Sequence, residues 1–168
     1  MASTRHFLTV NADLLFKECV SLNIIYNSTK YYVKINRPGF AKTFFESASE
    51  EREHAIKLIE YLSMNFKNYL GEISTYEWAT GVEALKDALK LEAKVTDYIR
   101  GVIKVCENNE AFNDYHLVDY LTDEYLTEQY HGQRVLAGQA STLDKMMGAH
   151  GALGEFLFDK KLLSGAPL

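Results

Sequence analysis

The chain has 168 residues, 47% of them hydrophobic and 24% charged, which allows one domain with a hydrophobic core and is typical of globular proteins. Its net charge of −5 argues against a nucleic-acid partner and favours a surface that attracts cations. No apolar run approaches the ~20 residues of a membrane-spanning helix, so we expect no membrane association. No secretory signal opens the sequence, so the location stays open: cytoplasmic as the chain stands, or the secretory pathway if a signal peptide has been removed.

The predicted elements, in chain order, are all helices. Only two prolines occur, Pro38 and Pro167, and the long stretches without Gly or Pro favour long helices. We expect one domain over residues 1–168, with four long helices and a short fifth at about 7–33, 39–66, 81–107, 113–147 and 152–163. Helices of about 27 residues are about 40 Å long at 1.5 Å per residue, so four of them predict an all-α, elongated four-helix bundle.

The first helix, about 7–33, has an apolar face that steps by four and three residues. This face consists of Leu15, Cys19, Leu22, Tyr26, Thr29 and Val33. Glu18 lies on its flank. Cys19 and Cys106 match neither a disulfide framework nor a zinc-binding spacing, so we expect both to be buried free thiols.

The second helix, about 39–66, places two ionisable residues on its apolar face. That face steps by four and three residues through Phe40, Phe44, Ser47, Glu51, His54, Leu58 and Tyr61. The neighbouring charged residues Glu50, Arg52 and Glu53 fall off this face and are expected to be solvated. Glu51-x-x-His54 is therefore predicted to point into the bundle.

The third and fourth helices show the same anomaly, because each has a polar residue in the middle of an apolar face. In the third helix the face consists of Val82, Leu85, Leu89, Glu92, Thr96, Ile99, Ile103 and Cys106. In the fourth it consists of Val118, Thr122, Tyr125, Gln129, Gly132, Leu136, Ala140 and Leu143. Glu92 is the only charged residue of its face, and Gln129 lies in the middle of the other.

Burying an unpaired carboxylate costs several kcal/mol or more, so buried charges are paired or bind metal. Two carboxylates, an imidazole and an amide that converge in a bundle core would suit a metal ion. An inward Glu-x-x-His with glutamates from other helices is typical of di-iron carboxylate sites. The alternative is a hydrogen-bonded polar layer that only sets the register of the helices, and spacing alone leaves both open.

A second Glu-x-x-His occurs at Glu128 and His131. Together with Glu51 and His54 it would give the two pairs found in oxygen-activating di-iron enzymes. It lies off the face that Gln129 belongs to, however. We therefore interpret Glu128 and His131 as surface or inter-subunit residues.

Several stretches together resemble a ferritin subunit of the insect type, closest to its heavy, iron-oxidising form. They are NRPGFAKTFFESASEEREHAIKLIEYL, GVEALKDALKLEAKV, FNDYHLVDYLTDEYLTEQY, LAGQASTLDKM and LGEFLFDKKLL, and they cover the four helices after the first. The resemblance implies a ferritin-like four-helix bundle with a short C-terminal helix, assembled into a hollow 24-subunit cage. It implies iron, as Fe²⁺ and Fe³⁺, stored as a ferric oxide mineral.

The resemblance also implies a ferroxidase centre built from Glu51, His54, Glu92 and Gln129, the four residues that helical spacing selects. A ferritin centre further needs a glutamate on the first helix and a tyrosine seven residues later. No register supplies both. Depending on the alignment, the glutamate position holds Phe16, Lys17 or Glu18, and the tyrosine position holds Asn23, Ile24 or Ile25. The centre is therefore expected to be impaired or partial, unless Glu18 completes it.

Two other ferritin sites carry over by resemblance. Glu46, Glu50 and Glu53 match acidic residues that nucleate mineral on the inner surface of the cage, although a plain solvated face is the alternative for them. Asp119 and Thr122 match positions that line the threefold channel, where Asp119 would attract entering cations. The last helix resembles the segment that closes the fourfold axis.

The leading hypothesis is an iron-storage cage subunit with an impaired ferroxidase site, either as a homo-oligomer or co-assembled with another ferritin subunit. The first alternative is a fully active ferroxidase that recruits Glu18. More remote alternatives are a di-iron enzyme that activates oxygen and a metal-free helical bundle. The match through the last helix disfavours both, because only a cage needs that segment.

Overall fold

The computed structural model describes residues 28–62, 77–108 and 114–165, and every regular element in these ranges is a helix. Residues 28–34 are helical. They are followed by α2 (Pro38–Leu62), α3 (Gly81–Asn108), α4 (Tyr115–Tyr120), the π-helix η1 (Leu121–Leu126), α5 (Thr127–His150) and α6 (Ala152–Ser164). The prediction of an all-α protein is confirmed.

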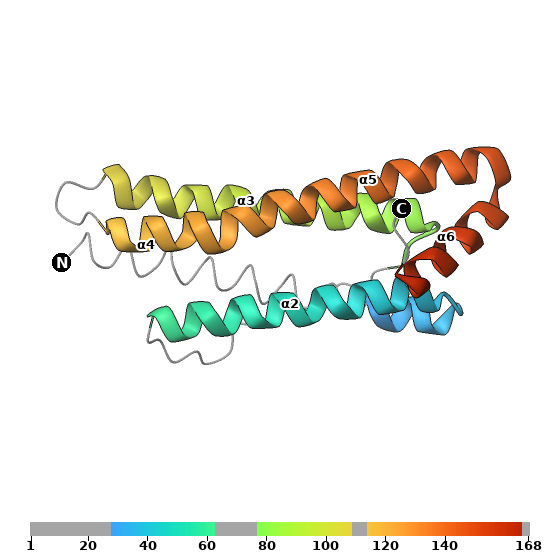
Figure 1. The fold of residues 1–168 in the computed structure, drawn as a ribbon, viewed down its shortest axis with the longest axis horizontal. Helices are drawn as coiled ribbons and strands as arrows, with labels where there is room; N and C mark the ends of the chain where they lie inside the picture. Colours follow the sequence, from blue (N-terminus) through green and yellow to red (C-terminus); the bar gives the residue numbers. More distant parts are fainter. Residues whose placement is uncertain (1–27, 63–76, 109–113, 166–168) are drawn as a thin grey trace.

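The long helices lie side by side along the length of the molecule (Figure 1). α3 packs along the continuous rod formed by α4, η1 and α5, and α2 runs along the other side (Figure 1). α6 folds back across one end and packs on both α5 and α2. The turn before α6 is made at Gly151, whose φ of 55° is a left-handed conformation that glycine adopts readily. The fourth helix was expected to end near 147, but it continues to His150, because the positive φ comes only at Gly151.

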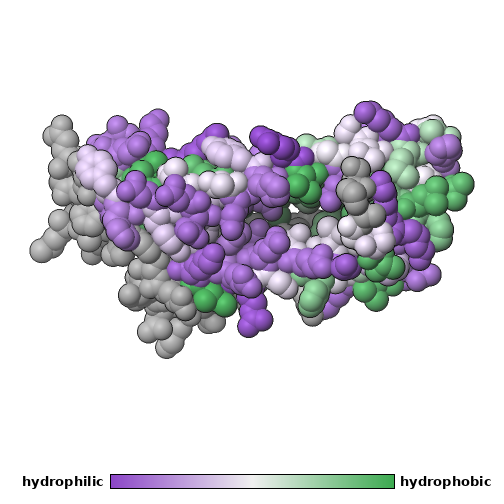
Figure 2. All heavy atoms as spheres, in the orientation of Figure 1, coloured by the Kyte–Doolittle hydropathy of each residue, from purple (hydrophilic) through white to green (hydrophobic). Residues whose placement is uncertain are grey.

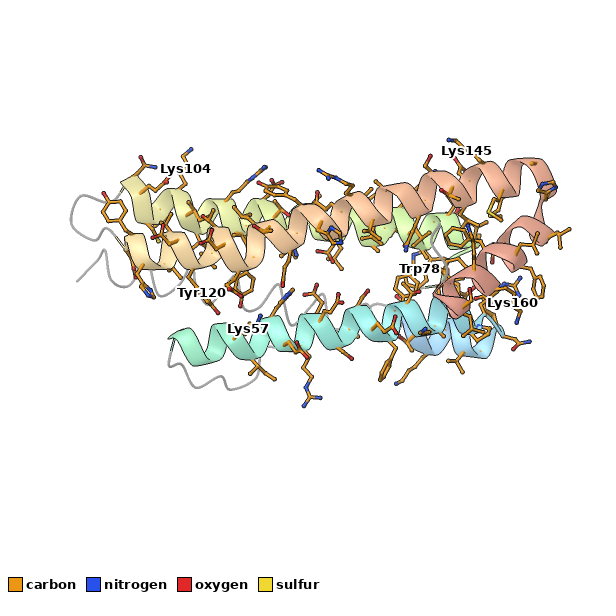
Figure 3. All side chains as sticks on the ribbon, in the orientation of Figure 1. Lys57, Trp78, Lys104, Tyr120, Lys145 and Lys160 are labelled. Carbon is orange, nitrogen blue, oxygen red and sulfur yellow. The ribbon has the colours of Figure 1, made fainter. Side chains whose placement is uncertain are left out.

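The described side chains form two hydrophobic clusters. The first lies at the α6 end and is largely aromatic, and its large members are Tyr32, Phe40, Phe44, Trp78, Leu85 and Phe158. The Tyr32 ring stacks on Phe40 with ring centres 4.9 Å apart and on Trp78 at 6.3 Å, and Trp78 lies beside α6 in Figure 3. The second cluster lies toward the opposite end, between α3 and the α4–η1 segment. It contains Cys106 as a buried free thiol, as expected, whereas Cys19 lies outside the described residues.

α6 docks through two buried carboxylates, each of which meets the start of another helix. The Asp159 carboxylate accepts a hydrogen bond from the backbone N–H of Phe40 at 3.0 Å, in the first turn of α2. Glu155 accepts one from the N–H of Gly81 at 3.4 Å, where α3 begins, and pairs with Arg37 at 3.4 Å. Helix N-termini favour negative charge, so these contacts satisfy both the carboxylates and the unpaired N–H groups.

Close approach of α6 also depends on glycine. A Cβ added at Gly39 would lie 1.9 Å from the carbonyl oxygen of Asp159, and one at Gly154 would lie 2.3 Å from that of Met146. Both obstacles are backbone atoms, which cannot move aside as a flexible side chain can. The two glycines therefore set how closely α6 lies against α2 and α5.

The π-helix η1 corrects the predicted apolar face of the fourth helix. Leu117 and Leu121 are buried there, whereas Val118 is only partly buried and Thr122 is exposed. The buried positions 117, 121, 125 and 129 recur every four residues, a spacing that drifts around a regular helix of 3.6 residues per turn. The wider turns of a π-helix, with hydrogen bonds from i to i+5, keep these positions on one side.

The predicted apolar face of the first helix is wrong at its end. Val33 is 65% exposed, and Ser28 and Tyr32 are buried instead. Tyr32 stacks against the rings of Phe40, Phe44 and Trp78, and this aromatic contact sets which side of the helix faces inward. The earlier positions of that face, and also Glu18 and Lys17, lie outside the described residues. No helix in the described part of the chain is long and apolar enough to cross a membrane.

Candidate metal centre

The four residues selected by helical spacing lie around one cavity in the middle of the bundle. Glu51 and His54 come from α2, Glu92 from α3 and Gln129 from α5, and all four line a cavity of about 500 Å³. Glu51 and Gln129 are each only 4% exposed. The surface over the middle of the molecule is mainly hydrophilic, whereas hydrophobic side chains gather at the α6 end (Figure 2). The cavity itself is lined mainly by polar and charged side chains.

The geometry of α2 explains why Glu51 and His54 face the same way. Residues three apart lie on one side of a helix, about one turn from each other. Ala48 and Ala55, one turn before and one turn after Glu51, are buried and small. Small neighbours leave room for a carboxylate and an imidazole within the core.

His54 is held on two sides. Its Nε2 lies 2.6 Å from Oε2 of Glu128 on α5, and its backbone carbonyl accepts a hydrogen bond from the Tyr125 hydroxyl at 3.0 Å. The other ring nitrogen, Nδ1, is buried and has no hydrogen-bond partner. An imidazole nitrogen that is buried but unused is unusual, because buried polar atoms are nearly always hydrogen-bonded.

A second set of contacts orients Gln129. The Thr96 hydroxyl lies 3.0 Å from Oε1 of Gln129 and 3.0 Å from the backbone carbonyl of Glu92. The same hydroxyl accepts a hydrogen bond from Nε2 of Gln133 at 2.5 Å. These bonds tie α3 to α5 beside the cavity.

The electrostatics of the cavity suit a cation. Burial is the main cause that raises the pKa of Glu92 to about 7, and the nearby Glu51 carboxylate raises it further. A hydrogen bond from Gln129 and the proximity of His54 act in the opposite direction. A bound cation would stabilise the ionised form of both carboxylates, because an opposite charge nearby favours the charged state.

The donor set fits iron or a similar divalent ion in its chemistry. Carboxylate oxygens, an amide oxygen and an imidazole nitrogen suit hard to borderline metals, and Nδ1 of His54 is available. Among the described residues, however, no three or more His, Cys, Asp or Glu side chains are grouped closely enough to hold an ion. The cavity gathers the donors, and their side chains would have to draw together around a metal.

The structure also shows where the other predicted site residues lie. Glu46, Glu50, Glu53, Asp119, Thr122, Glu128 and His131 are exposed, and of these Glu50, Glu53, Glu128 and His131 line the cavity. Sequence spacing missed the contact between Glu128 and His54. A signal was present, because Glu128 lies beside Gln129 on the same turn, but its position off the apolar face favoured a surface role.

Comparisons with known proteins agree with this architecture. A family model described as a ferritin-like domain matches residues 12–146. The ferritin heavy chain of Papilio xuthus is 59% identical over 142 residues, which cover 77% of this chain and 65% of the relative. The Drosophila melanogaster ferritin heavy chain is 56% identical over 136 residues, covering 76% of this chain and 66% of the relative. The chain thus spans slightly less than two thirds of the length of these insect relatives.

The fold comparison covers more of the chain. The crystal structure of Trichoplusia ni secreted ferritin matches 96% of this chain and 90% of its own, with a TM-score of 0.87 and 48% identity. A second ferritin, the soma ferritin of Lymnaea stagnalis, is 35% identical over 148 residues and is covered over 82% of its length. By sequence and by fold, the chain belongs to the ferritin family.

Proposed function

We propose that this chain is a subunit of an iron-storage cage that sequesters iron as a ferric oxide mineral and has an impaired or partial ferroxidase site. The observation that carries the proposal is the cavity at which Glu51, His54, Glu92 and Gln129 meet from three helices. Membership of the ferritin family and the names of the insect relatives, ferritin heavy chains, support iron as the cargo.

The impairment follows from the charges that a di-iron site must balance. Two metal ions about 3.5–4 Å apart repel each other, and bridging carboxylates offset this repulsion. Glu51 would bridge, with His54 on one metal and Glu92 and Gln129 near the other. If Lys17 stands at the position of the missing glutamate, the first metal loses a ligand and meets a positive charge instead.

One observation favours the alternative, a fully active site that uses Glu18. Positions seven residues apart repeat on one face of a bundle helix. Glu18 precedes the buried Tyr32 by two such repeats in the sequence, and this spacing supports Glu18 as the missing ligand. Lys17 precedes Tyr31 by the same spacing, and Tyr31 is only partly buried.

Stopped-flow oxidation of two Fe²⁺ per subunit separates the two readings. We expect slow oxidation without an early burst, and no change in Glu18→Ala. A burst within seconds that disappears in Glu18→Ala would instead show an active centre with Glu18 as a ligand. His54→Ala serves as the control that identifies the part of the oxidation that depends on the site, because it removes the only imidazole among the four proposed ligands.

Assembly into a closed cage of about 24 subunits, alone or with another ferritin subunit, follows from the family of hollow cages that the chain resembles. Light scattering in near-neutral buffer should report a large particle. A stable monomer or dimer would contradict the cage and leave the metal cavity to be explained separately.

Within that cage we propose Glu46, Glu50 and Glu53 as a mineral-nucleating surface, supported by their exposure along one helix. Asp119 and Thr122 are likewise exposed, and we place them at the threefold channel. Repeated copies of Asp119 around one axis would attract Fe²⁺, so Asp119→Ala should slow iron uptake. Equal uptake by the variant and the parent would exclude this route.

Export from the cell is supported by the likeness to a secreted ferritin. We expect the protein in the secretory fraction of cells that express its full-length gene. Recovery only from the cytosolic fraction would contradict this.

A further inference from the structure

Glu128 makes a short polar contact to one of the four proposed ligands. Its Oε2 lies 2.6 Å from Nε2 of His54, across the space between α5 and α2. The Glu128 side chain is 52% exposed, whereas that of His54 is 12% exposed. A carboxylate at the rim of the cavity thus reaches an imidazole inside it.

The two nitrogens of His54 are in different situations. An ionised carboxylate can only accept a hydrogen bond, so Nε2 must carry a proton when it bonds to Glu128. A neutral imidazole has one N–H, and in this arrangement Nδ1 keeps its lone pair. Nδ1 is also the buried atom without a hydrogen-bond partner. The contact therefore selects the tautomer in which the inner nitrogen can bind a metal.

We propose that Glu128 is a positioning residue for the metal centre: by accepting the Nε2 proton of His54, it holds the ring and presents Nδ1 as the metal ligand. This inference rests on the metal-binding function proposed above for the cavity. Carboxylates that accept from the outer nitrogen of a ligating His are known to orient the ring and raise its basicity. Glu128 itself is not proposed as a ligand.

The simpler interpretation is an exposed ion pair that only holds α2 against η1 and α5. The chain contains such a pair nearby, since Lys57 on α2 lies 3.6 Å from Glu124 on η1, and Lys57 points toward that side in Figure 3. The Glu124 side chain is 50% exposed, nearly the same as that of Glu128. Glu124→Ala therefore removes a comparable bridge without touching His54 and is the matched control.

The test uses the full-length protein and Co²⁺ alone, whose binding is followed by visible absorption. The relevant signal is the part of Co²⁺ binding that His54→Ala removes. We expect Glu128→Ala to weaken that part about 10- to 100-fold, as is usual when the partner of a ligating His is lost. Glu128→Gln should retain most of the affinity, because its amide oxygen still accepts from Nε2–H. Glu124→Ala should leave the affinity unchanged.

A second readout needs no metal. Histidine ¹⁵N chemical shifts, assigned with His54→Ala, should show the Nε2–H tautomer of His54 in the metal-free parent and in Glu128→Gln. In Glu128→Ala the two tautomers should be mixed. A bridge that serves stability alone would not change these shifts.

The outcomes separate this proposal from the function on which it rests. Parent-like Co²⁺ binding and tautomer in Glu128→Ala would overturn the positioning role and leave the metal centre standing. A Glu128→Gln variant as weak as Glu128→Ala would also overturn it, because charge rather than the hydrogen bond would then be decisive. Equal Co²⁺ binding by the parent and His54→Ala would overturn the metal centre itself.

Discussion

Two regions of the molecule each bring together two buried or partly buried carboxylates, and they differ in what balances the charge. At the α6 end, Glu155 and Asp159 accept hydrogen bonds from backbone N–H groups at the starts of α3 and α2, and Arg37 adds a positive charge. In the middle of the bundle, burial and the nearby Glu51 carboxylate raise the pKa of Glu92 to about 7. The first pair is satisfied by the fold, whereas the second is best satisfied by a cation.

The difference shows that a buried acid does not by itself indicate a functional site. Helix N-termini carry a partial positive charge that stabilises a carboxylate without any ligand. The middle of three long helices offers no such terminus, so the charge must be met by side chains or by an ion. The distance of a buried acid from the helix ends is therefore part of the functional argument.

The largest change in stability is expected from overpacking the α6 end. Gly39→Ala places a Cβ 1.9 Å from the carbonyl oxygen of Asp159, so α6 must move away from α2. We expect a loss of about 3 kcal/mol in the free energy of unfolding, the upper part of the range for overpacking. Chemical denaturation at fixed protein concentration measures it.

The control is Gly101→Ala, also within a helix, where an added Cβ meets nothing within 4 Å. It should raise stability by up to about 1 kcal/mol, because alanine favours helix over glycine. Similar effects at the two positions would mean that α6 does not pack on Gly39 as described.

A smaller effect is expected from removing the carboxylate that meets α2. Asp159→Ala leaves the N–H of Phe40 buried and unpaired, which should cost about 2 kcal/mol of stability. The control is Asp144→Ala, which removes an exposed acid 3.8 Å from Lys86 and should change stability by less than about 0.5 kcal/mol. If the two variants were equally stable, Asp159 would not act as a cap for α2.

The sequence was sufficient to select four of the residues that line the polar cavity, because each of them interrupts an apolar face with a period near 3.6. The same counting misplaced Val118 and Thr122, since it assumes a regular helix and cannot detect η1. It misplaced Val33 because the aromatic stack around Tyr32 depends on contacts between distant parts of the chain. Helical spacing could not predict the contact of Glu128 with His54 for a similar reason. This contact depends on the reach of an exposed side chain from one helix to another.

The smallest change in stability is expected in the middle of the bundle, and it should be a gain rather than a loss. The folded-state pKa of Glu92, about 7, is above the ordinary value of 4.5, so the folded state binds more protons between these values. The contribution of Glu92 to stability is therefore present below pH 4.5 and is lost as the pH rises through 7. Glu92→Gln has no charge to bury. In metal-free protein at pH 8 it should be more stable than the parent by about 1 kcal/mol, a value reduced from the full shift because water reaches the cavity.

The matched change at the α6 end is Glu155→Gln, the same substitution of an amide for an acid. It weakens the contacts with Arg37 and with the N–H of Gly81, so it should lower stability where Glu92→Gln raises it. At pH 5 the gain from Glu92→Gln should nearly vanish, because Glu92 is then largely protonated in the folded state. Thermal unfolding of both variants and the parent at pH 5 and pH 8, with a chelator present, measures all four differences. A destabilised Glu92→Gln at pH 8 would mean that the fold already balances the charge of Glu92, and the contrast between the two regions would disappear.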